Sequence, residues 1–148
     1  MHTEHLQNVH TARVLAGWLV AIAVTSLIIL ALIGLGLLEG VANAGTFWSL
    51  IAVLAGFFAG GFFAGFRAIE APILHGAAIG LTSLVVWVAV NLITSVTLPD
   101  FGWQRLTPSL AVALLLVQLA AAVVGALIGY SVALRGRPGL SEHEPLPD

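Results

Sequence analysis

Residues 47–66 have the sequence FWSLIAVLAGFFAGGFFAGF, a run of apolar and small residues without a charged side chain. An α-helix rises about 1.5 Å per residue, so this run is long enough to cross the roughly 30 Å of hydrocarbon in a bilayer. Its glycines recur at four-residue spacing, with Gly56 and Gly60 on one line and Gly61 and Gly65 on another. Small residues at this spacing are typical of helices that pack closely in membranes. The run therefore predicts a transmembrane helix with two contact faces.

Three further apolar runs flank this one, at residues 12–38, 73–98 and 106–134 of the 148-residue chain. Lipid offers no partner for backbone N–H and C=O groups, so each crossing must be a helix, and the runs lack the alternation of barrel strands. The composition agrees, because hydrophobic residues make up 59% and charged residues only 8%, where about 25% charged is usual for soluble domains. We expect an all-α fold, an integral membrane antiparallel bundle of four transmembrane helices.

The connections between the runs are short and contain glycine and proline, which favours an up-down-up-down order. Pro108 suits the first turn of the fourth helix, where a missing N–H costs little. We expect residues 1–11 to form a polar cytoplasmic tail, residues 12–135 to form the four-helix domain, and the acidic, proline-containing residues 136–148 to be disordered.

The arginines indicate how the bundle is oriented in the membrane. Arg13, Arg67, Arg135 and Arg137 fall on one side of the expected topology, and Arg105 falls on the other. Positive residues favour the cytoplasmic side of membrane proteins. The pattern predicts a multi-pass protein of the plasma (cytoplasmic) membrane with both termini in the cytoplasm.

Small residues mark the faces where helices should touch, because apolar burial alone cannot drive association inside lipid. A helix with two such lines, like the second, should contact two neighbours and lie centrally. The predicted helix-packing positions are Gly56, Gly60, Gly61, Gly65, Gly76, Gly80, Gly125 and Gly129.

The composition excludes several function classes. There is no cysteine, so disulfides and thiolate chemistry are excluded, and five arginines without lysine cannot form the basic surface that nucleic acid needs. No nucleophile–base pair, phosphate-binding glycine loop or paired carboxylates are evident. We therefore expect no enzyme, no catalytic residue, no cofactor and no metal site.

Two intramembrane amides, Asn91 and Gln118, stand out among the polar residues. Asn91 shares nearly one helical face with Gly80, and Gln118 shares one with Gly125. They could hydrogen-bond to each other across the third and fourth helices, contributing about 0.6–2 kcal/mol. The alternative is that both line a polar cavity. Serine and threonine in the spans are expected to bond back to their own helices.

A second cluster lies at the expected cytoplasmic interface, where Arg67 and Glu70 end the second run and His75 begins the third. A snorkelling arginine that marks the membrane boundary explains this cluster simply. A pH-sensing or anionic-lipid-binding role is the functional interpretation.

Two segments carry a resemblance, AGFFAGGFFAGFRA at residues 55–68 and LHGAAIGL at residues 74–81. Together they resemble small, uncharacterised bacterial four-helix transmembrane proteins, in which a Gly/Ala-rich helix end leads through a short basic turn into Leu-His-Gly-Ala. The resemblance implies a four-helix plasma-membrane protein and carries over no catalytic or binding residue. The chain departs from the pattern at Phe66 and Glu70.

Two function hypotheses follow. The first is a membrane component without catalytic chemistry that acts through helix packing as an accessory, assembly or homo-oligomeric protein, with the lipid bilayer, a second copy or another membrane protein as its partner. The alternative is a small-solute or ion permease or channel with a polar path near Asn91 and Gln118.

Overall fold

The computed structural model describes residues 10–38, 44–68, 71–97 and 108–136. These residues form four helices, α1 (Thr11–Gly34), α2 (Ala44–Arg67), α3 (Pro72–Thr97) and α4 (Pro108–Arg135). All four are long and apolar enough to cross a membrane. The expected all-α class, a bundle of four membrane-spanning helices, is confirmed.

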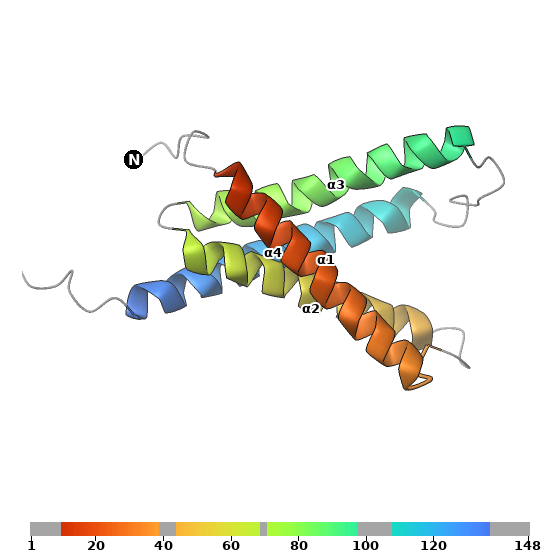
Figure 1. Ribbon diagram of the computed structural model, residues 1–148, viewed down its shortest axis with the longest axis horizontal. Helices are drawn as coiled ribbons and strands as arrows, with labels where there is room; N and C mark the ends of the chain where they lie inside the picture. Colours follow the sequence, from red (N-terminus) through yellow and green to blue (C-terminus); the bar gives the residue numbers. More distant parts are fainter. Residues whose placement is uncertain (1–9, 39–43, 69–70, 98–107, 137–148) are drawn as a thin grey trace, which may run out of the picture.

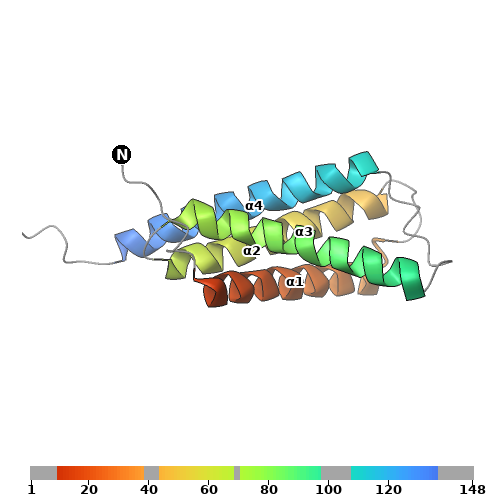
Figure 2. The same ribbon diagram turned by 90° about the horizontal axis from the view of Figure 1, so that it is seen from above.

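The helices alternate in direction, so that α2 and α4 run the same way and α1 and α3 run the opposite way (Figures 1 and 2). The α2 helix packs against α1 on one face and against α4 on another, and α3 packs mainly on α4. The central place expected for the second helix is thus observed. Figure 1 shows α1 crossing the other helices obliquely.

The first helix ends earlier than its apolar run suggested, at Gly34 rather than near residue 38. Gly36 adopts a left-handed backbone with φ of 68°. Its N–H donates to the Ile33 carbonyl at 2.9 Å, and the Leu37 N–H donates to the Leu32 carbonyl at 3.0 Å. This pair of bonds is the Schellman termination of a helix, which satisfies carbonyls that a longer helix would have used.

The other bounds differ from the expected ones by about three residues or fewer. The largest of these differences is at α2, which begins at Ala44 instead of residue 47. Pro108 is the first residue of α4, in the first turn where it was expected.

The interior of the bundle consists mostly of small side chains. Ala21, Ala122 and Ala126 are fully buried, and the largest fully buried side chains are Ile79 and His75. Most of the bulky aliphatic side chains lie outside, as with Leu19 and many others along the four helices. A soluble bundle shows the reverse arrangement, with large apolar side chains in the core and polar ones outside.

Candidate functional site

One face of α2 lies directly on the backbone of α1. A Cβ atom placed on Gly60 would meet the carbonyl oxygen of Gly17, and one placed on Gly56 would lie 2.7 Å from the carbonyl oxygen of Ala21. Real Cβ atoms do not approach other heavy atoms so closely. The two helices therefore touch backbone to backbone, and only glycine fits at these two positions.

The neighbouring line of α2 makes the same kind of contact with α4. A Cβ on Gly61 would meet the carbonyl oxygen of Ala122, and a Cβ on Gly65 would meet that of Ala126, one turn further along. Because α2 and α4 run in the same direction, matched turns of the two helices stay opposite each other along the interface.

The remaining predicted packing glycines, on α4 and α3, also lie close to a neighbouring helix. On α4, a Cβ on Gly125 would meet the carbonyl oxygen of Phe58 and one on Gly129 that of Phe62. On α3, a Cβ on Gly76 would lie 2.7 Å from the Cα of Val123 on α4. The eighth packing position, Gly80, likewise faces α4, where its Cβ would lie 2.9 Å from the Cα of Leu119.

The two intramembrane amides do not bond to each other, contrary to expectation. Gln118 Oε1 accepts a hydrogen bond of 2.9 Å from the hydroxyl of Ser83, which joins α4 to α3. Asn91 Nδ2 donates to the carbonyl of Trp87 on its own helix at 2.7 Å. The reason is axial position, because Asn91 lies eight residues, or about 12 Å of helical rise, beyond Ser83. Gln118 is level with Ser83 and out of reach of Asn91.

Four of the described hydroxyl side chains, those of Thr25, Thr82, Ser83 and Thr94, differ in their hydrogen bonds. Thr82 and Thr94 bond back to carbonyls one turn earlier on α3, as expected. Ser83 does not, because it donates across to α4. Thr25 departs from the expectation in another way, since its buried hydroxyl has no hydrogen-bond partner among the described residues.

His75 is completely buried, one turn into α3. Its Nδ1 lies 3.0 Å from the carbonyl oxygen of Ala71, which sits before the helix with a left-handed φ of 51°. Nδ1 can donate to that carbonyl, which places a proton on Nδ1. Nε2 is buried and has no partner within the described part of the chain.

Arg67 and His75, placed in one cluster by their proximity in sequence, have different surroundings. Arg67 is exposed, and its guanidinium carbon lies 4.5 Å from the centre of the Phe63 ring. Glu70, the third expected member, lies outside the described residues. The structure therefore does not bring the arginine and the histidine to a common surface.

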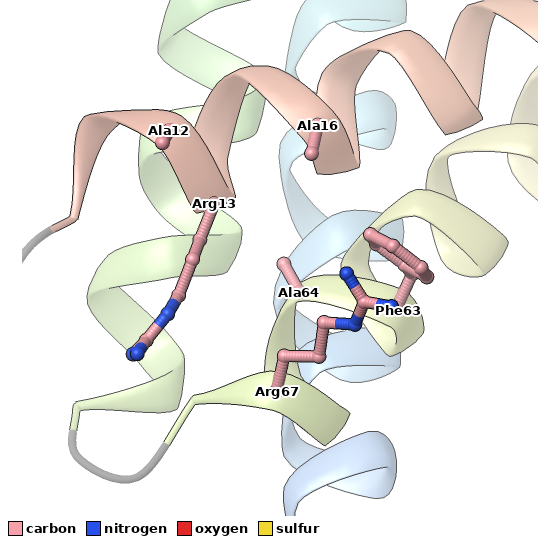
Figure 3. Close-up of a pocket in the computed structure, with 6 residues that line it drawn as sticks. All are labelled: Ala12, Arg13, Ala16, Phe63, Ala64 and Arg67. Carbon is pink, nitrogen blue, oxygen red and sulfur yellow. The ribbon is translucent and has the colours of Figure 1, made fainter.

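Arg67 instead shares a cleft with Arg13, a pairing that the sequence analysis missed. The cleft has a volume of about 190 Å³ and lies between the start of α1 and the end of α2 (Figure 3). The signal was available in the sequence, because consecutive antiparallel helices bring the start of one and the end of the next to the same end of the bundle.

These features define the class of protein. Four apolar helices with small residues at their contacts and large aliphatic residues outside form a multi-pass helical membrane protein. Comparison of the chain with protein-family models, curated proteins and solved structures finds no match. Its function is therefore argued from its own residues.

Proposed function

We propose that this chain is a non-enzymatic component of the plasma membrane that acts through helix packing, as an accessory, assembly or homo-oligomeric protein. The observation that carries the proposal is the double contact of α2, whose glycines meet the backbone of α1 on one face and that of α4 on the other. A bundle whose central helix is fixed on two sides is suited to serve as a rigid unit. The resemblance of residues 55–81 to small, uncharacterised bacterial four-helix membrane proteins bears on the architecture and not on the role.

The proposal includes an outward surface for a partner helix. The first part of α3 is buried at His75, Gly76 and Ile79, whereas Val85 and Leu92 in its second part are 66% and 64% exposed. In a bilayer such a face meets lipid or another transmembrane helix. A second copy of the chain or another membrane protein would dock there by close packing of the same kind.

The alternative, a permease or channel, has one observation in its favour, the polar Ser83–Gln118 contact within the span. However, the Gln118 oxygen and the Asn91 amide nitrogen each have a partner inside the protein. The Gln118 bond joins α4 to α3 and the Asn91 bond stays within α3, so neither group is left free to line a polar path, and the helix-packing role is the better supported one.

Two measurements on the full chain in lipid nanodiscs and proteoliposomes separate these functions. Native mass spectrometry is expected to show a fixed stoichiometry, either of several copies or of one copy with a membrane partner. Proteoliposomes are expected to show no solute or ion flux above that of empty vesicles. A monomer that conducts solute, with the flux abolished in Asn91→Leu and Gln118→Leu, would overturn the proposal in favour of a permease.

A further inference from the structure

The cleft between α1 and α2 has room for a bound group. Its volume of about 190 Å³ is several times the roughly 30 Å³ that one water molecule occupies in the liquid. Three of its walls are short side chains, which leave the space between the two arginines open. The residues that line it are Ala12, Arg13, Ala16, Phe63, Ala64 and Arg67.

Arg67 is held in place within this cleft. Its side chain folds back over Phe63, as Figure 3 shows, and a cation–π contact of 4.5 Å joins the two. A guanidinium stacked on a ring keeps its N–H groups at its edge, where they can donate two parallel bonds to a phosphate. The arrangement therefore presents an oriented anion donor and reduces the entropy lost on binding.

The electrostatics of the cleft favour an anion. In the described ranges, which omit residues 69–70 among others, no aspartate or glutamate occurs. Neither Arg13 nor Arg67 has a carboxylate partner within that part of the structure. Figure 3 shows Arg13 extending from α1 toward the same end of the bundle that carries Arg67. The two guanidiniums point to opposite sides of the cleft in Figure 3, and their positive charge makes the space between them favourable for an anion.

The position of the cleft favours a lipid over a free ion. Arg13 lies in the first turn of α1 and Arg67 in the last turn of α2, so both are at the boundary of the apolar spans. Leu15 and Leu19 continue the helical face of Ala12 and Ala16 away from that boundary, and they are 48% and 61% exposed. A phospholipid would place its phosphate at the arginines and an acyl chain along this leucine face.

We propose that the Arg13–Arg67 cleft binds the phosphate of an anionic phospholipid. This binding site is additional to the packing role proposed above and does not depend on it. Arg13 and Arg67 supply the charge and the hydrogen bonds, Phe63 orients Arg67, and the alanines provide the space.

The test is native mass spectrometry of the full chain in a neutral detergent, titrated with phosphatidylglycerol or with phosphatidylcholine. We expect phosphatidylglycerol to bind about tenfold more tightly, and Arg13→Ala and Arg67→Ala each to lower its affinity about tenfold, the effect of losing one charge-assisted hydrogen bond. Arg135→Ala is the matched control, because this exposed arginine lies at the same end of the bundle and outside the cleft. The affinity of this control variant for phosphatidylglycerol is expected to stay within about twofold of that of the unmodified chain.

Further measurements distinguish a lipid phosphate from free phosphate, and a lost binding site from a misfolded variant. Inorganic phosphate that displaces the lipid at equal concentration would overturn the assignment to a lipid. Equal binding of the two phospholipids, or an equal loss in Arg135→Ala, would overturn the site itself. Phe63→Leu leaves both charges in place and is expected to weaken binding about threefold, because the cation–π contact that orients Arg67 is lost. Full affinity in Arg67→Ala with an unchanged melting temperature would also overturn the site.

Discussion

Glycine at a helix contact allows two backbones to approach closely, because it has no side chain to separate them. The Gly61 backbone meets the Ala122 carbonyl, and a methyl group there would have to separate α2 from α4. In lipid the contact energy comes from packing and not from escape from water, so a separation of even half an ångström forfeits a large share of it. The helix propensity that alanine adds over glycine cannot offset a loss spread along the whole interface.

The Ser83–Gln118 hydrogen bond can be tested by mutating its two partners. We expect a double-mutant cycle of Ser83→Ala and Gln118→Leu to give a coupling energy of about 0.6 kcal/mol, and at most about 1.7 kcal/mol, the range for hydrogen bonds between membrane helices. Unfolding in bicelles measures it. The control is Asn91→Leu, whose bond to Trp87 lies within α3 and which should show no coupling to Gln118. A coupling of zero between Ser83 and Gln118 would contradict the observed contact.

The individual contacts could be predicted only in part. Four-residue spacing was enough to select the glycines, because one helical period places them on one line. The partner of Gln118 was missed for two reasons. Its identity depends on how far α3 slides along α4, which helical periodicity does not encode. A bond from Ser83 to another helix was also not expected, because serine in a membrane helix usually bonds its own backbone.

The α1 helix ends inside an apolar run, at a point that hydropathy does not predict. Leu35, Leu37 and Leu38 remain apolar past the last helical residue. The chain nevertheless leaves the helix because Gly36 adopts a left-handed φ of 68°, which costs glycine nothing and other residues about 1–2 kcal/mol. An apolar run therefore predicts the existence of a membrane helix well and its last turn poorly.

Substitution of Gly36 tests this termination. No atom lies within 4 Å of a Cβ at Gly36, so any cost is a backbone cost. Gly36→Ala is expected to lower the free energy of unfolding by about 1 kcal/mol. Gly36→Asn should lose less, because asparagine tolerates the left-handed region. Equal stability of both variants with the unmodified chain, measured in bicelles, would contradict the assigned backbone.

In the bundle as a whole, the directions of the helices gather the positive charges at one end. Every described arginine lies at one end of the bundle, because α1 begins there with Arg13 and α2 and α4 finish there with Arg67 and Arg135. The class of the fold could be predicted from hydropathy and charge alone, since lipid allows few backbone solutions. The oblique crossing of α1 could not, because spacing along one helix does not encode the angle at which its neighbour crosses it.

The arginine end is predicted to lie in the cytoplasm, and this orientation can be tested directly because the sequence has no cysteine of its own. A single cysteine in place of Asp100 is expected to react with a membrane-impermeant maleimide in intact cells. A cysteine in place of Glu70 is expected to react only after the membrane is opened, as the positive-inside rule predicts. The reverse labelling pattern would show that the bundle is inverted.

We expect backbone contact at the α2 glycines to hold the bundle together in the membrane. The most direct test compares the free energies of unfolding of Gly61→Ala and Gly34→Ala, measured by steric trapping in bicelles. Gly61 lies against the α4 backbone, whereas a Cβ on Gly34 meets no atom within 4 Å. We expect Gly61→Ala to lower the free energy of unfolding by about 1–3 kcal/mol and Gly34→Ala to leave it unchanged. Equal unfolding free energies for the two variants would contradict this expectation.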